Sequence, residues 1–326
     1  MASRMRILVT GGAGYIGSHM VKLLVETGAE VTVLDDLSTG HADAVRGGKF
    51  VKGDVSDIAA TAKLLAERSI QAVVHFAAAS LVGESVADPL KYYTRNVGGT
   101  TALLRAMRDA SVDRMVFSST AAVYGDPQRQ PIDEAHPLQP INPYGSTKLA
   151  IERMLAECSV AYGLRAVSLR YFNAAGADPA AGLGERHDPE THLIPLVLRA
   201  AAKNTSVSVF GNDYPTRDGT CIRDYIHVAD LCDAHLRALE WLDGGVRCES
   251  FNLGNGGGAT VLEVIDAARR VTGREIKILS AARRAGDPPS LVADAAKARR
   301  ALGWQAAHAD IEGIVRDAWG YEQRKP

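Results

Sequence analysis

Tyr144 and Lys148 lie four residues apart at the start of a predicted helix that reaches about Tyr162. Positions i and i+4 share a helix face, so the two side chains point the same way. A neighbouring ammonium favours phenolate, so Tyr144 could act as a base well below its free pKa of about 10. Thr120 ends a hydroxyl-rich run and can bridge Tyr144 to a substrate hydroxyl. This tyrosine–lysine spacing also occurs by chance on solvated helices, so its meaning depends on the rest of the chain.

Three glycines, Gly11, Gly14 and Gly17, lie between a short apolar run and a stretch with helical periodicity. The apolar run Ile7–Val9 is typical of a strand buried on both faces of a parallel sheet. Strand, glycine-rich turn and helix start form a phosphate cradle in this order. Glycine permits the tight turn and the close approach, and the helix N-terminus offers free N–H groups.

Asp35 closes a second apolar strand, Val31–Leu34, about 20 residues after the cradle, which completes a βαβ unit. We expect Asp35 to accept a hydrogen bond from an adenosine ribose. Its negative charge disfavours a 2′-phosphate, which predicts NAD rather than NADP. The alternative is a glycine-rich turn with a surface aspartate. A positive nicotinamide would also favour the phenolate of Tyr144, and Lys148 can hold the nicotinamide ribose.

Strands and helices alternate as far as Leu169, which predicts an α/β fold with a Rossmann-type, doubly wound sheet of six or more parallel strands. After the first two, the predicted strands are 50–55, 72–76, 114–118 and 164–169. Later elements are mixed and predict a smaller C-terminal α+β domain. We place the domains at 1–175 and 176–326, and we expect some later segments to return to the sheet.

Polar and small residues on these elements suggest further contacts. Asn96 lies in a helix predicted from Leu90 to Ala110, where asparagine is unfavourable, so we expect a buried hydrogen bond. Asp54 could meet the adenine ring together with Val55, and capping of the following helix is an equally good interpretation. Small residues after the fourth strand leave room for a flat ligand.

The composition excludes several classes of partner. Hydrophobic residues make up 46% of 326 residues and the formal net charge is −1, without a basic block, so we expect neither nucleic acid nor a membrane as partner. The cysteines show no metal-ligand spacing, so we predict no metal and reduced thiols in the cytoplasm. Met1–Met5 is too short for a signal peptide, and no apolar run reaches the roughly 18 residues of a membrane span.

Motifs along nearly the whole chain resemble the extended short-chain dehydrogenase/reductase superfamily and, within it, the UDP-glucose 4-epimerase family. The N-terminal motifs are TGGAGYIGSH (10–19), LDDLSTGH (34–41), HFAA (75–78), VGES (82–85), FSSTAAVYG (117–125) and NPYGSTK (142–148). The C-terminal motifs are LRYFNAAGA (169–177), HLIP (192–195), FGNDYPTRDGTCIRDYIHV (210–228) and RAGDP (284–288). The second group is more specific, because it belongs to nucleotide-sugar recognition.

The resemblance implies an NAD site in residues 1–175 and a UDP-sugar site in residues 176–326, with Tyr144, Lys148 and Thr120 as the catalytic residues. The positions assigned to NAD are Gly11, Gly14, Tyr15, Ile16, Gly17, Asp35, Asp36, Asp54, Val55, Phe76, Ala77, Ala78, Ser80, Asn96, Lys148 and Phe172. The positions assigned to the UDP-sugar are Asn173, His192, Leu193, Phe210, Arg223, Arg284, Asp287 and Leu291.

Physical roles fit several of the UDP positions. Arg223 and Arg284 can clamp a diphosphate, Phe210 can cover the uracil, and Asp287 can accept from the uridine ribose. The alternatives are pairing of Arg223 with Asp224 and a solvated surface position for Arg284.

Some positions depart from the pattern of the family. Thr120 replaces a frequent serine, and Asp36 replaces a frequent asparagine and adds a second negative charge. Ser80 stands where some relatives have a cation, and His192 where asparagine is common. Leu291 aligns with a gate that is large in epimerases restricted to plain hexoses and small in those that accept N-acetylated ones.

The resemblance therefore implies reversible C4 epimerisation of UDP-glucose and UDP-galactose through a 4-keto sugar, with bound NAD, in a cytoplasmic homodimer. A 4-epimerase of a related UDP-sugar (N-acetylhexosamine, uronic acid or pentose) is the alternative. Ala121 and Ala122 argue against a 4,6-dehydratase, which needs an acid and a base directly after the threonine. A non-catalytic NAD-sensing protein would not be expected to keep the proton-transfer residues.

Overall fold

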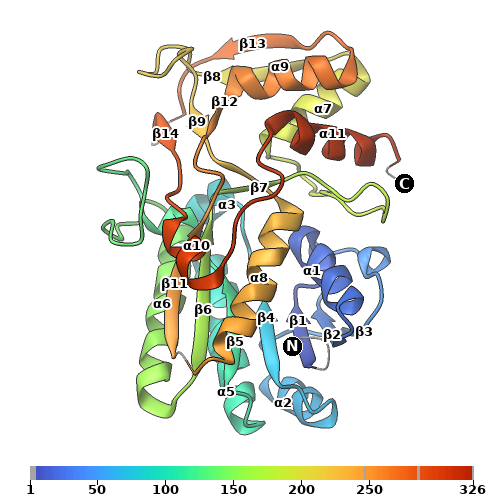
Figure 1. Cartoon of the computed structure of the whole chain (residues 1–326), viewed down its shortest axis with the longest axis vertical. Helices are drawn as coiled ribbons and strands as arrows, with labels where there is room; N and C mark the ends of the chain where they lie inside the picture. Colours follow the sequence, from blue (N-terminus) through green and yellow to red (C-terminus); the bar gives the residue numbers. More distant parts are fainter. Residues whose placement is uncertain (1–4, 246, 285–286, 325–326) are drawn as a thin grey trace.

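The computed structural model describes residues 5–245, 247–284 and 287–324. Its centre is a seven-stranded parallel sheet (Figure 1). In spatial order the strands are β11 (Cys248–Leu253), β6 (Arg165–Tyr171), β5 (Arg114–Ser118), β4 (Ala72–His75), β1 (Arg6–Thr10), β2 (Glu30–Asp35) and β3 (Lys49–Lys52). The order reverses between β1 and β4, and sheets of this kind bind ligands beyond the strand ends at that point. The predicted Rossmann-type sheet is confirmed. Met1–Arg4 of the N-terminal stretch, and Ala285 and Gly286 of the RAGDP motif, lie outside the described residues.

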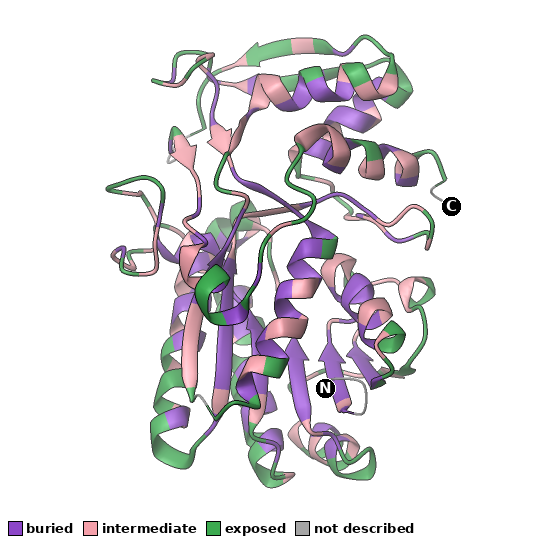
Figure 2. Cartoon of the chain, in the orientation of Figure 1, coloured by how far each residue is buried: buried purple, intermediate pink, exposed green. Residues whose placement is uncertain are grey.

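Helices with apolar faces cover both sides of the sheet. One side carries α1 (Tyr15–Glu26) and α8 (Val228–Leu242), and the other carries α2 (Ile58–Glu67), α5 (Gly99–Asp109) and α6 (Pro143–Tyr162). Along β1, Ile7 and Val9 join the core beneath α1 and α8, whereas Leu8 joins the opposite core. Successive strand side chains point to opposite faces, so a continuous apolar run serves both cores. Figure 2 shows the central strands of the sheet buried and the outer faces of its helices exposed.

The segment between β4 and α5 is less regular than the single helix predicted for residues 90–110. It contains α3 (Val82–Ala87), α4 (Pro89–Tyr92) and a π-helical stretch, η3 (Tyr93–Gly98). The wider turn carries Asn96, which is buried. π-Helical turns within helices are frequent at functional sites. Two further short helices are η2 (Ala42–Ala44) and η4 (Ala121–Val123).

A smaller α+β region lies beyond one end of the sheet (Figure 1). Its helices α7 (Leu193–Lys203), α9 (Val261–Thr272) and α11 (Ile311–Glu322) enclose a separate apolar core with the parallel pair β8 (Ser206–Phe210) and β13 (Lys277–Ala281). Short strands connect this region to the sheet: β7 (Asn173–Ala175) pairs with β10 (Tyr225–His227), and β9 (Ile222–Arg223) pairs with β12 (Ala259–Thr260) and β14 (Ser290–Leu291).

The chain returns to the sheet after residue 176, as expected. α8 packs against α1 and the sheet, β11 pairs with β6 along its full length, and α10 (Ala296–Leu302) contacts both. The linear division at 1–175 and 176–326 stays a prediction. Among the described helices, none is long and apolar enough to cross a bilayer.

Candidate active site

Tyr144 is held in the first turn of α6. Asn142 caps this helix through a hydrogen bond from the Gly145 N–H to its side-chain oxygen (2.9 Å), and Pro143 occupies the first turn. The Tyr144 N–H donates to the Ser85 hydroxyl at 3.2 Å. A capped start with proline at N1 is a pre-organised helix N-terminus. The phenol is therefore fixed beside the end of β5.

Lys148 lies one turn further along α6 and is buried, with 2% of its surface exposed. Its Nζ donates to the carbonyl oxygen of Ser118 at 2.8 Å and lies 5.8 Å from the centre of the Tyr144 ring. Burial lowers the pKa of Lys148 to about 7, although the charge of Glu152 opposes this shift. The ammonium form is expensive to bury, and the Ser118 carbonyl gives it one fixed partner.

The pKa of Tyr144, predicted to be lowered by Lys148 and a positive nicotinamide together, is not lowered in the protein alone. Burial raises the pKa of Tyr144 to about 12, although a hydrogen bond with Thr120 opposes the rise. The reason is that desolvation disfavours the phenolate more than this hydrogen bond favours it. Thr120 also caps η4, where its hydroxyl accepts from the Ala122 N–H at 3.1 Å. The three predicted catalytic residues do meet at one point.

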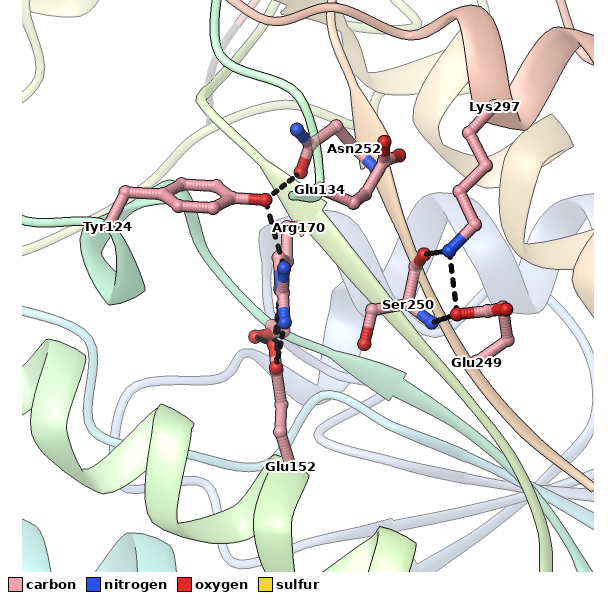
Figure 3. Close-up of polar contacts among 9 residues, drawn as sticks. Tyr124, Glu134, Glu152, Arg170, Glu249, Ser250, Asn252 and Lys297 are labelled. Carbon is pink, nitrogen blue, oxygen red and sulfur yellow. Dashed lines mark hydrogen bonds and ion pairs between the residues drawn. The ribbon is translucent and has the colours of Figure 1, made fainter. Parts of the chain in front are cut away.

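A buried ion pair supports this corner of the sheet (Figure 3). Arg170 on β6 pairs with Glu152 on α6 at 2.5 Å, and both side chains are 6% exposed. Arg170 also donates to the Tyr124 hydroxyl (2.9 Å), which in turn donates to Asn252 on β11 (2.7 Å). Ser119 donates to Glu152 at 2.5 Å. The network links α6 to the strand end that carries Thr120, and no spacing of residues along the chain predicts it.

The glycines of the cradle fit a dinucleotide. Gly11 has φ +70°, and a Cβ there would lie 2.6 Å from the backbone nitrogen of Ala77. A Cβ on Gly17 would lie 2.1 Å from the carbonyl oxygen of Gly11. Backbone from β1 and β4 therefore approaches too closely for any side chain at these positions. No side chain caps the start of α1, so its first N–H groups are available to a phosphate.

Asp35, the last residue of β2, and Asp36, which follows it, lie in different environments. Asp35 is buried and accepts from the Ala13 N–H (2.9 Å) and the Leu37 N–H (2.8 Å), so its carboxylate is fixed beside the cradle. Burial raises the pKa of Asp35. Asp36 lies 3.5 Å from Arg95, which offsets the second negative charge.

Other cofactor positions are placed as follows. Asn96 makes the expected buried hydrogen bonds: its side chain accepts from the Ala79 N–H (2.8 Å) and donates to the Ala79 carbonyl (3.0 Å). Tyr15 donates to the carbonyl of Gly176 at 2.6 Å, joining the cradle to the C-terminal region.

The interpretation of Asp54 as the cap of the following helix is wrong, because Asp57 caps α2 and Asp54 accepts from the Ser56 N–H instead. Phe76 packs on the core of the sheet and Ser80 is exposed.

A cavity of about 640 Å³ collects every predicted UDP-sugar position except Leu291. Arg284 stacks over the Phe210 ring, 4.0 Å from its centre. Arg223 pairs with Asp287, not with Asp224. The Asp224 carboxylate instead accepts from the N–H groups of 255, 256 and 293.

His192 lines this cavity but is engaged by two acids. Its Nδ1 lies 2.5 Å from Glu185 and 3.4 Å from Glu190. Burial alone would lower the pKa of His192, but hydrogen bonds to both carboxylates outweigh it and raise the pKa to about 10. No role was predicted for Glu185 and Glu190, although their alternation with histidines in ERHDPETH (185–192) is visible in the sequence.

A model of the NAD dependent epimerase/dehydratase family matches residues 7–254 of this chain. The chain belongs to this family. Two similar relatives are proteins named UDP-glucose 4-epimerase. The one from Halalkalibacterium halodurans is 53% identical, over 99% of this chain and 97% of its own length, and the one from Lacticaseibacillus casei is 49% identical, over 99% and 98%. A crystal structure of UDP-glucose 4-epimerase from Brucella ovis in complex with NAD superposes with a TM-score of 0.95 at 51% identity, covering 97% of this chain and 98% of that one. The resemblance inferred from the motifs is confirmed.

Proposed function

We propose that this member of the NAD dependent epimerase/dehydratase family catalyses the reversible epimerisation of UDP-glucose and UDP-galactose at C4. The full-length match to relatives of that name carries the proposal. The proton-transfer residues, the glycine cradle and the arginine-lined cavity support it, because they supply the groups that this reaction needs.

The chemistry that NAD supplies when bound is reversible hydride transfer at C4 of the sugar, which regenerates the cofactor in each cycle. Tyr144 takes the proton of the C4 hydroxyl and returns it, and Thr120 orients that hydroxyl. The protein alone holds the pKa of Tyr144 near 12, so the positive charge of oxidised nicotinamide is needed to favour the phenolate. Lys148 holds the nicotinamide ribose and adds a second positive charge when protonated.

Inversion requires a tightly held nucleotide and a loosely held hexose, because the keto sugar must present its opposite face. Arg223 and Arg284 hold the diphosphate, Phe210 covers the uracil and Asp287 accepts from the uridine ribose. Asn173, His192 and Leu193 complete the nucleotide contacts. Ala121 and Ala122 carry no titratable group, so elimination of water is not expected.

The experiment is conversion of UDP-galactose to UDP-glucose by the purified full-length protein, followed by chromatography. We expect turnover without added NAD, because the cofactor is regenerated in place. Tyr144→Phe should lower kcat by roughly 10² or more while the protein still binds UDP. Normal turnover in that variant would remove Tyr144 from the mechanism, and lack of turnover in the wild type would contradict the function itself.

We also propose that the protein is a cytoplasmic homodimer, in which residues 1–175 bind NAD and residues 176–326 bind the UDP-sugar. The dimer face would be formed by η3, α5 and α6, as the family resemblance implies. Exposed apolar side chains on and beside these elements support this face: Val86, Leu90, Tyr93, Val160 and Tyr162. Sedimentation at micromolar concentration should give a dimer, and a monomer there would contradict the proposal.

A further inference from the structure

Four potential metal ligands converge in the segment between β7 and α7. Glu185, His187, Glu190 and His192 each point one ligand atom inward, and these atoms all lie within 4.8 Å of one another. The Oε1 atom of Glu185 lies 2.8 Å from Nδ1 of His187 and 2.5 Å from Nδ1 of His192. Nδ1 of His192 lies 3.4 Å from Oε1 of Glu190. Bonds of about 2.0–2.2 Å at tetrahedral angles place the ligands of zinc roughly 3.4 Å apart, so small outward shifts would admit an ion.

The two carboxylates are buried to a degree that demands a cation. The side chain of Glu190 is 1% exposed and that of Glu185 is 7% exposed. Arg199 lies 3.3 Å from Glu190 and supplies one positive charge. In the metal-free protein, Arg199 and a protonated His192 balance the two carboxylates, and a divalent cation would take the place of the His192 proton. Buried carboxylates are stable when paired or when bound to a metal.

The carboxylate of Glu190 is held in a fixed orientation by backbone hydrogen bonds, as ligating carboxylates in metal sites are. Its Oε1 accepts from the N–H groups of Thr191 (2.9 Å) and His192 (3.0 Å). Outer hydrogen bonds of this kind fix ligating carboxylates in metal sites. Two nitrogens and two carboxylate oxygens form a mixed set that suits zinc and neighbouring divalent transition metals.

We propose that Glu185, His187, Glu190 and His192 bind one divalent transition-metal ion, with Zn²⁺ as the preferred occupant. This differs from our prediction of no metal, which considered the cysteines only. Four protein ligands make a closed site, and closed zinc sites are structural rather than catalytic. Binding displaces the proton shared between His192 and the acids. The competing arrangement is a metal-free ion pair of protonated His192 with Glu185 and Glu190.

The position of the cluster indicates what the ion would hold in place. The His187 ring packs edge-on against the Tyr15 ring of the cofactor cradle, with 6.4 Å between centres. His192 and Glu185 line the proposed nucleotide cavity, and His192 is the N-cap of α7. An ion here would lock the segment that spans both sites, far along the chain from Tyr144.

The test uses the full-length chain without a polyhistidine tag, stripped with a chelator and then titrated with ZnCl₂ against a chromogenic competitor. We expect one zinc per chain by elemental analysis and a rise in Tm of a few degrees at saturation. His187→Asn and Glu190→Gln should each weaken zinc binding by about tenfold or more. His308→Asn is the matched control, because it removes another histidine–carboxylate pair (His308 and Asp230, 2.8 Å) that lies outside the cluster.

Absence of stoichiometric zinc binding by the wild type would overturn the proposal and favour the metal-free ion pair. Zinc binding that both cluster variants retain would also overturn it, because the ion would then lie elsewhere. Circular dichroism of each stripped variant shows whether it is folded, and either variant alone suffices if the other is not. The readout does not involve turnover, so it is independent of the proposed function.

Discussion

The ammonium of Lys148 donates to the carbonyl oxygen of Ser118, 2.8 Å away, and lies 5.8 Å from the centre of the Tyr144 ring. The protein lowers the pKa of this lysine to about 7 and raises that of the tyrosine to about 12. Both shifts oppose the charged forms that proton transfer requires. The fold therefore keeps its most reactive pair in an unfavourable environment, which has measurable consequences.

Lys148→Met should stabilise the cofactor-free protein at neutral pH. Removing the buried charge relieves a penalty set by the shift from 10.5 to about 7. The variant also leaves the Ser118 carbonyl without its donor, which cancels part of this stabilisation. We therefore expect a net rise of about 2 kcal/mol in the free energy of unfolding. Turnover should fall by roughly 10² or more.

Urea unfolding of cofactor-free protein measures the first effect. Lys63→Met is the control, since Lys63 is a lysine on α2 with 74% of its side chain exposed. Its unfolding free energy should change by less than about 0.5 kcal/mol. A loss of stability in Lys148→Met would mean that the lysine is better compensated than its contacts indicate.

His75 should make the fold sensitive to acid. The ring lies between the hydroxyls of Thr10 (2.6 Å) and Thr100 (3.0 Å), and burial lowers its pKa from 6.5 to about 3. Between these values the unfolded chain binds a proton that the folded chain does not. Stability from this residue is therefore complete above 6.5 and is lost as the pH falls towards 3.

At a pH of about 4.5 the loss due to His75 amounts to roughly 2–3 kcal/mol relative to neutral pH. His75→Asn should have a lower free energy of unfolding at neutral pH. The slope of its unfolding free energy against pH should be shallower in acid, by an amount that corresponds to close to one bound proton. The measurement is urea unfolding over this pH range. Equal slopes in the two proteins would show that His75 is charged in the fold.

Arg170→Met should destabilise the protein by about 3–5 kcal/mol, because Glu152 would keep a buried charge without its partner. The double variant Arg170→Met, Glu152→Met should recover most of this loss, since no isolated charge remains. A double-mutant cycle in urea measures both. If the double variant has a lower free energy of unfolding than Arg170→Met, the two side chains stabilise the fold by more than the neutralisation of each other's charge.

Leu291 should control the size of the accepted sugar. It pairs with Arg223 between β14 and β9 and packs on the apolar group that contains Ala121 and Val123, directly after Thr120. We expect UDP-galactose to be the main substrate and UDP-N-acetylgalactosamine a poor one. Leu291→Tyr should remove any N-acetyl activity and Leu291→Ala should raise it, as measured by the ratio of kcat/KM values. An unchanged ratio would show that Leu291 is not the gate.

Local patterns were sufficient to predict the sheet, its helices and the glycine cradle, because periodicity and turn residues act over a few positions. The pairing of Arg223 with Asp287 was missed because the partners lie 64 residues apart. The rise in the pKa of Tyr144 in the protein without nucleotide was not predicted, because it depends on burial, which spacing does not reveal. The Glu185–His192 cluster went unassigned because a polar loop has no periodicity that marks its side chains as convergent.

The late return of the chain to the sheet has a consequence for dissecting the molecule. β6 ends at Tyr171, yet its outer neighbour β11 comes only from residues 248–253, and the face beneath α8 is covered by residues 228–242. Cutting at residue 175 would bare a seven-residue strand edge together with an apolar face. Such a fragment would expose a template for edge-to-edge aggregation. Residues 1–175 and 176–326 are therefore not exchangeable modules, and a new specificity must be introduced by replacing side chains in the intact chain.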